Sequence, residues 1–234
     1  MEAINEIQKY IAGLDIPAAL NVLANRFKNK VIFSTSFGRE DQVITHIIFS
    51  NNIPIKIVTL DTGRLFPETY SVWNRTLEIY KKKIEVCFPD TDKTEKLLKE
   101  KGPFSFYESV ENRKECCFIR KVEPLNRILK GNKIWITGIR KGQSADRSNM
   151  QNMEWDESHR VIKYHPLLDW TGGRVSDFIA KHTIPYNSLH DRGFPSIGCQ
   201  PCTRAVKEGE DERGGRWWWE NNSKKECGLH ANPA

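Results

Sequence analysis

Four of the six cysteines fall in two closely spaced pairs, a pattern typical of metal or redox sites. Cys199-Gln200-Pro201-Cys202 is a CxxC sequence, which spaces two thiols for one metal centre. Cys116 and Cys117 are adjacent, so on a helix their side chains would point about 100° apart. A tetrahedral zinc ion would need a kink to bind both, whereas a larger iron–sulfur cluster accepts both more easily. The spacing favours a metal centre over the alternative, a thiol–disulfide pair at Cys199 and Cys202 with two structural cysteines elsewhere.

Positive side chains flank both cysteine pairs, where they would compensate the charge of four thiolates. These residues are Arg113, Lys114, Arg120, Lys121 and Arg204. Over all 234 residues, 36 Lys and Arg exceed 30 Asp and Glu, for a formal net charge of +6. This mild excess does not indicate nucleic acid as a partner, but it agrees with a local site for an anionic ligand.

Cys227 is a lone thiol near the end of the chain, with Lys224, Lys225 and His230 close by. Cations lower the pKa of a thiol and raise its thiolate fraction, as a nucleophile requires. The residues alone also allow an incidental terminal cysteine. Cys87 ends an apolar run, which predicts a small core residue.

Strands alternating with helices must position these groups. Apolar runs at 31–33, 55–60, 84–88 and 133–137 predict buried strands, and helical stretches separate them. The alternation predicts an α/β fold with a parallel, twisted sheet flanked by helices. Ligands of such sheets bind at the carboxyl ends of the strands, where three polar loops follow.

The first of these loops, Ser34–Gly38, has the composition of a phosphate cradle. Hydroxyls of Ser34, Thr35 and Ser36 add donors to the free N–H groups of the following helix, and Gly38 permits close approach. Simple helix capping is the alternative interpretation. Guanidinium groups suit phosphate and sulfate oxygens, and several arginines lie near the strand ends or in the C-terminal part: Arg64, Arg140, Arg147, Arg213 and Arg216.

The composition changes beyond about Lys207, which predicts a main domain over 1–206 and a mobile, docking tail over 207–234. No apolar run approaches the roughly 20 residues that span a bilayer. The first residues also lack the apolar core of a signal peptide. We therefore expect a cytoplasmic protein with no membrane partner. Trp217, Trp218 and Trp219 are expected to dock the tail rather than to stack on nucleic-acid bases.

Beyond these patterns, the chain resembles the assimilatory adenylyl-sulfate and phosphoadenylyl-sulfate reductases from Ser34 to His230. The resemblance rests on these motifs: STSFGRED (34–41), LDTGRLFPETY (60–70), RKECC (113–117), RKVEPL (120–125), WITGIRKGQSADR (135–147), IPYNSLHDRGFPSIGCQPCT (184–203), EDERGGRWWWE (210–220) and KECGLH (225–230). It implies a fold of the adenine-nucleotide α-hydrolase-like type. It also implies a reductase that converts activated sulfate to sulfite.

The resemblance implies a role for each matched residue. Cys227 would attack the sulfur of adenylyl sulfate, releasing AMP and leaving an S-sulfocysteine that thioredoxin or glutaredoxin then cleaves. Cys116, Cys117, Cys199 and Cys202 would hold a [4Fe–4S] cluster, with Lys121 between the cluster and the sulfate. The other residues matched to substrate binding are Ser34, Thr35, Ser36, Gly38, Leu60, Thr62, Gly138, Arg140, Arg147, Arg213, Arg216 and His230. Members of the family are often homo-oligomers.

The first loop departs from the pattern of many members specific for adenylyl sulfate. Those members read Ser-Phe-Ser-Gly, whereas Thr35-Ser36-Phe37-Gly38 is closer to the branch that uses the 3′-phosphorylated nucleotide. That branch typically lacks the four cysteines, so we expect adenylyl sulfate as the substrate. The alternative is 3′-phosphoadenylyl sulfate, instead or as well, with Arg39 as the candidate contact for its 3′-phosphate. Two other classes stay open: a tRNA-thiolating sulfurtransferase, whose usual Ser-Gly-Gly-x-Asp-Ser loop is missing, and a thiol redox sensor acting through Cys227.

Overall fold

The computed structural model describes residues 2–144 and 147–220, and its centre is a six-stranded sheet in the order β3-β2-β1-β4-β6-β5. The strands are β1 (Val31–Thr35), β2 (Lys56–Leu60), β3 (Glu85–Cys87), β4 (Ile134–Ile136), β5 (Met153–Asp156) and β6 (Val161–Tyr164). All neighbouring pairs are parallel except β5 and β6, which are antiparallel. The expected α/β fold with a mostly parallel sheet is confirmed.

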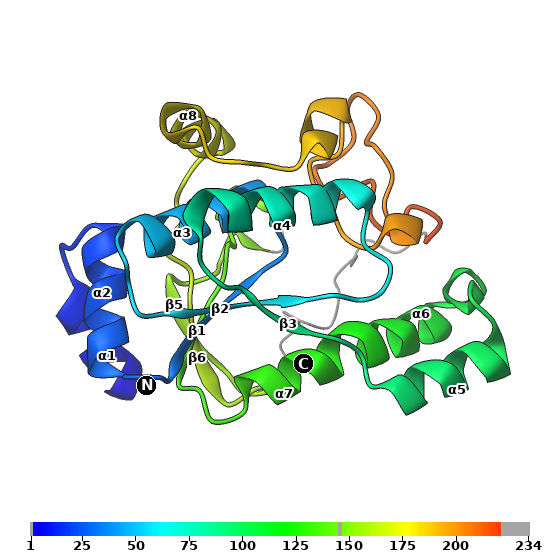
Figure 1. The fold of residues 1–234 in the computed structure, drawn as a ribbon, viewed down its shortest axis with the longest axis horizontal. Coiled ribbons are helices and arrows are strands. Elements are labelled where there is room, and N and C mark those ends of the chain that lie inside the picture. Colours follow the sequence, from blue (N-terminus) through cyan, green and yellow to red (C-terminus); the bar gives the residue numbers. More distant parts are fainter. Residues whose placement is uncertain (1, 145–146, 221–234) are drawn as a thin grey trace.

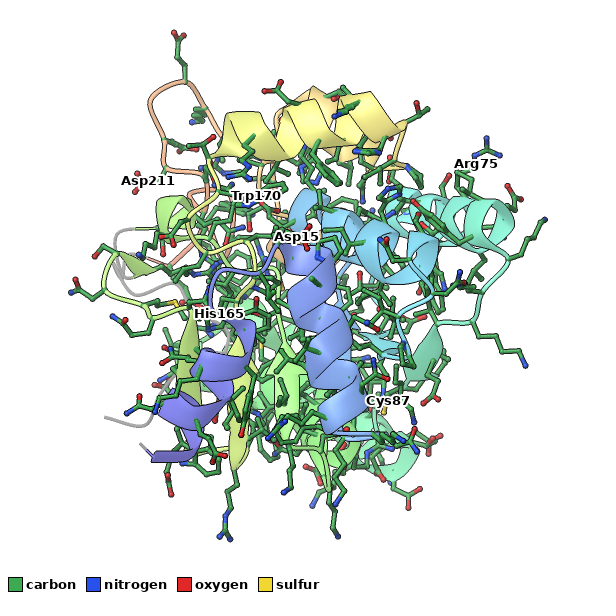
Figure 2. The ribbon with its side chains drawn as sticks, turned by 90° about the vertical axis from the view of Figure 1, so that its left-hand side faces the viewer. Asp15, Arg75, Cys87, His165, Trp170 and Asp211 are labelled. Carbon is green, nitrogen blue, oxygen red and sulfur yellow. The ribbon has the colours of Figure 1, made fainter. Side chains whose placement is uncertain are left out.

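Helices cover both faces of this sheet, with α3 and α4 on one side and α5, α6 and α7 on the other (Figure 1). The helices are α1 (Glu2–Ile11), α2 (Ile16–Arg26), α3 (Arg39–Ser50), α4 (Pro67–Tyr80), α5 (Thr91–Lys101), α6 (Val110–Cys117), α7 (Glu123–Leu129) and α8 (Gly172–His182). Asp15 caps α2 by accepting a hydrogen bond from the Ala18 N–H, and Figure 2 labels this side chain. None of the described helices is both long and apolar enough to cross a membrane.

Alternating side chains of β1 enter two separate cores. Val31 and Phe33 pack with residues of α2 and α3 in the larger cluster, whereas Ile32 packs with Leu125 and Leu129 of α7 on the opposite face. This alternation is the consequence of the two-residue period of a strand. Burial on both faces explains why the sequence of β1 is a continuous apolar run.

Two strands were not predicted, and one side chain lies elsewhere than expected. β5 and β6 carry charged residues, and Lys163 is fully buried against Asp156 with 2.5 Å between Nζ and Oδ2. Because charged residues interrupt the apolar run, a search for such runs does not find a strand of this kind. Cys87 was predicted in the core but is only partly buried, because β3 is an edge strand (Figure 2).

The chain after α8 folds back over the ends of the strands and closes with the segment 207–220 (Figure 1). This segment is bound to the body by main-chain hydrogen bonds. Arg204 N donates to Gly215 O at 3.0 Å, and Trp217 N donates to Cys202 O at 3.1 Å. Residues 221–234, which include Cys227 and His230, lie outside the described residues.

Candidate active site

A pocket of about 240 Å³ opens where β1, β2 and β4 end, and most of the predicted substrate residues line it. Those lining residues are Ser34, Thr35, Ser36, Gly38, Leu60, Thr62, Lys121, Gly138, Arg147, Arg213 and Arg216. The loops that follow the strands were expected to meet at this edge, as parallel strands require. Their assignment to substrate binding stays a prediction.

The loop after β1 is held in a strained, fixed conformation. Phe37 has a φ of 61°, which is unusual for a residue with a side chain, yet its ring is buried and stacks on Trp73 with 5.5 Å between centroids. Its N–H donates to Thr35 Oγ1 at 3.0 Å. Backbone of this kind persists where the surrounding packing fixes it, as it does at many ligand sites.

Asp41, in the first turn of α3, holds this loop in place through hydrogen bonds. Its Oδ2 accepts hydrogen bonds from Ser36 N at 2.6 Å and from Ser36 Oγ at 2.7 Å. Burial raises the pKa of Asp41 to about 6, although the two hydrogen bonds from Ser36 oppose this shift. A Cβ at Gly138 would overlap Asp41 Oδ1, so only glycine fits where the loop after β4 crosses α3.

Arg140 differs from the other predicted phosphate ligands. It does not line the pocket; its guanidinium is buried, donates from Nε to Glu40 Oε1 at 2.6 Å, and lies 3.8 Å from Glu212 Oε2. Arg140 therefore joins α3 to the segment 207–220. Glu212 lines the pocket, and burial raises its pKa.

The four paired cysteines converge on a second, smaller cavity beside the pocket. Cys116 and Cys117 come from the end of α6, and Cys199 and Cys202 from the turn after α8. The helix changes to a π-helical turn at Phe118–Val122, directly after the adjacent pair. Burial raises the pKa of Cys202 to about 12 and also raises that of Cys116. All five described cysteines are free thiols.

The donor set of this cavity fits an anionic, thiolate-bound group. Besides the four thiols, its lining includes the cations Arg64, Arg113, Arg120 and Lys121. Arg113 and Arg120 are buried, and Arg64 and Lys121 are partly buried. Cations clustered next to four sulfur atoms match the negative charge of an iron–sulfur cluster with four cysteine ligands. The four thiols line this one cavity without being arranged to coordinate a single metal ion, and the same holds for every other group of His, Cys, Asp and Glu in the part of the chain that the structure describes.

The pocket and the cysteine cavity share a wall. Lys121 lines both of them. Thr62 lines the pocket, and its Oγ1 lies 3.3 Å from Cys199 Sγ. Arg120 Nη1 donates to the carbonyl of Thr62 at 2.7 Å, which ties the π-helical turn to the loop after β2. A charge in the cysteine cavity therefore lies close enough to the pocket to act on a ligand there electrostatically.

Sequence reasoning missed part of the pocket wall, namely Asp41, Trp135, His190, Glu212 and the segment 195–198. Trp135 Nε1 donates to Ser34 Oγ at 2.8 Å, and burial lowers the pKa of His190 to about 4. The segment 195–198 directly precedes the CxxC pair, so its position next to Cys199 was the available signal.

The fold and the pocket define an α/β protein with its candidate ligand site at the carboxyl edge of a mostly parallel sheet. Residues 30–205 match the phosphoadenosine phosphosulfate reductase domain. The adenosine 5′-phosphosulfate reductase of Burkholderia cepacia is 49% identical over 202 residues, which cover 86% of this chain and 81% of that protein. The enzyme of the same name from Agrobacterium fabrum is 46% identical over 220 residues, covering 94% and 84%. The chain thus belongs to the phosphoadenosine phosphosulfate reductase family.

Solved structures agree with this assignment. The phosphoadenylyl-sulfate reductase of Candida auris, solved as a phosphate complex, superposes with a TM-score of 0.73 at 29% identity, covering 88% of this chain and 97% of that one. The FMN adenylyltransferase of Candida glabrata is 17% identical with a TM-score of 0.54, covering 97% and 73%. The latter likeness concerns the fold alone.

Proposed function

We propose that this protein is an assimilatory adenylyl-sulfate reductase, which reduces adenylyl sulfate to sulfite and AMP. The relatives that bear this name match most of the chain and most of their own length. The observation that carries the proposal is the wall that the nucleotide pocket shares with the cysteine cavity through Lys121 and Thr62.

In the proposed reaction, the thiolate of Cys227 attacks the sulfur of the bound nucleotide. A sulfur–sulfur bond forms, and the bond from sulfur to the phosphate oxygen breaks, so AMP leaves with the electron pair. Negative charge then grows on the departing phosphate, where Arg147, Arg213 and Arg216 of the pocket would stabilise it. The proton of the thiol passes to solvent.

The second half of the reaction needs a dithiol, for which we propose thioredoxin or glutaredoxin. One thiolate of the dithiol attacks Sγ of S-sulfonated Cys227 and releases sulfite. The second thiol resolves the mixed disulfide, so the two electrons come from oxidation of the dithiol to a disulfide. The position of Cys227 in the last part of the chain suits a group that must meet both nucleotide and reductase.

Cys116, Cys117, Cys199 and Cys202 would hold the [4Fe–4S] cluster. When bound, the cluster supplies an electrostatic and structural partner for the substrate site rather than the reducing electrons. Lys121, as a cation in both walls, would orient the sulfate group toward the cysteine cavity. Four thiolates stay available to bind a cluster only in a reducing compartment, so we also propose a cytoplasmic location. The homo-oligomeric state stays a prediction, which size-exclusion chromatography with light scattering tests.

Intact-protein mass spectrometry after mixing with adenylyl sulfate, without reductant, tests the proposal. We expect one added sulfonate on Cys227, removed by reduced thioredoxin and missing in Cys227→Ser. A parallel reaction with 3′-phosphoadenylyl sulfate decides the substrate. Arg39, the candidate contact for a 3′-phosphate, is the first residue of α3, stands between the pocket residues Gly38 and Glu40, and pairs with Asp191 at 3.8 Å. A protein that forms no adduct with either nucleotide refutes the proposed mechanism.

A further inference from the structure

Arg113 and Glu220 form a buried, bidentate ion pair next to the cysteine cavity. Arg113 Nε donates to Glu220 Oε1 at 2.8 Å, and Nη2 donates to Oε2 at 2.9 Å. Both side chains are only 4% exposed. Buried arginine–carboxylate forks are geometrically specific, so this pair fixes the position of Glu220 and not only its charge.

The pair also connects the cysteine cavity to the nucleotide pocket through Trp217. Arg113 lines the cysteine cavity, and its guanidinium lies 4.7 Å from the Trp217 ring centroid. Arg216, which lines the pocket, has its guanidinium 4.8 Å from the same residue's ring. Trp217 is buried with a φ of 42°, an unusual backbone conformation that the packing on this ring holds in place.

Glu220 is the last residue of the described chain and follows the pocket residue Arg216 by four positions. Its N–H donates to the carbonyl of Trp217 at 2.9 Å, which closes a turn directly after Arg216. Cys227 follows Glu220 by seven positions. A chain of that length spans at most about 25 Å, so the anchored Glu220 sets an upper limit on the distance to Cys227.

We propose that Arg113 and Glu220 are positioning residues for the nucleophile. The ion pair fixes the origin of the segment that carries Cys227, raises the effective concentration of its thiol at the pocket, and aligns it with the bound nucleotide. The inference rests on the proposed function, because it concerns the attack of Cys227 on adenylyl sulfate. It assigns a role to Arg113 of the RKECC motif, in addition to the role of the two cysteines.

Glu220→Gln tests the proposal, since glutamine keeps the volume of the side chain but loses the charge and half of the fork. Glu210→Gln is the matched control. Glu210 also pairs bidentately with an arginine of the same region, Arg204, with both distances at 2.8 Å. These two side chains are about 30% exposed, and Glu210 lies ten positions before Glu220 in the chain.

The measurements are the single-turnover rate of Cys227 sulfonation at saturating adenylyl sulfate, the affinity for AMP by calorimetry, and the iron content per chain. We expect Glu220→Gln to sulfonate at least tenfold more slowly than wild type, with AMP affinity within twofold and iron content unchanged. Glu210→Gln should match the wild type in all three. Arg113→Lys, which keeps the charge but not the fork, should show the same split between rate and affinity.

Sulfonation of Glu220→Gln at the wild-type rate overturns the inference, as does a rate that falls only in step with AMP affinity or iron content. If Glu220→Gln does not fold, the same criteria apply to Arg113→Lys. A wild-type protein that forms no adduct refutes the proposed function instead, and the role of the pair falls with it.

Discussion

Gly138→Ala isolates the contact on which the conformation of the loop Ser34–Gly38 depends. The new Cβ would overlap Asp41 Oδ1 and lie 3.1 Å from Glu40 Cβ and 3.3 Å from the main-chain nitrogen of Asp41. Neither neighbour is the free end of a long side chain, so α3 and the loop after β4 must separate. Overpacking of this kind costs about 1–3 kcal/mol of folding stability.

The larger effect should fall on nucleotide binding, because Asp41 holds Ser36 by two hydrogen bonds to a buried carboxyl group. Each such bond contributes about 1.5–3 kcal/mol, and losing one while the loop shifts corresponds to roughly a 10- to 100-fold weaker affinity. Titration calorimetry with AMP measures the affinity, and urea unfolding measures the stability.

Gly173→Ala is the control, since its Cβ would meet only Thr171 Oγ1 at 3.8 Å in the first turn of α8. This change should leave AMP affinity unchanged and stabilise the fold by about 0.4–1 kcal/mol. Wild-type AMP affinity in Gly138→Ala would refute the reasoning that Asp41 fixes the loop.

Three further predictions concern buried or shared charges. Because burial raises the pKa of Asp41 to about 6, the stability that its protonated form contributes is complete below about pH 4 and is lost as the pH rises through 6. The free energy of unfolding of Asp41→Asn, measured in urea, should therefore rise by on the order of 3 kcal/mol relative to that of the wild type between pH 4 and pH 8. A difference between the two proteins that does not depend on pH would contradict this. Lys163→Met leaves Asp156 buried without its cation and should cost about 3–5 kcal/mol in the same assay, whereas a loss below 1 kcal/mol would mean that the pair is dispensable. Lys121→Ala should lower kcat/KM for adenylyl sulfate by at least about 100-fold with iron content unchanged, and equal losses of iron and activity would instead make Lys121 a structural residue.

The strands β1, β2 and β4 were predictable because burial on both faces makes their sequences largely continuous apolar runs. β3 was predicted from the apolar residues around it, although as an edge strand it is largely exposed. β5 and β6 were not, since Lys163 and Asp156 neutralise each other only once the hairpin has formed. This ion pair exists only in the folded hairpin, and no local period of the sequence encodes it.

The candidate site shows the same division. Loops at strand ends could be placed from the sequence, because parallel strands all end at one edge. The use of each side chain could not: Arg140 stands in the expected loop, yet its guanidinium is buried against Glu40 and Glu212. Both of these carboxylate partners lie more than 70 positions from Arg140 in the sequence, so the local sequence does not reveal the contact. The cysteine pairs were predictable as a set, because thiols at such spacing have few other uses.

The pocket draws its walls from both ends of the described chain, with residues 34–38 on one side and Glu212 to Arg216 on the other. We expect contacts of such long range to form late in folding, after the sheet that brings them together. On the ribosome, a nascent chain would complete its sheet before its last wall had been synthesised. Nucleotide therefore contributes nothing to the early steps of folding, and its binding stabilises only the finished protein.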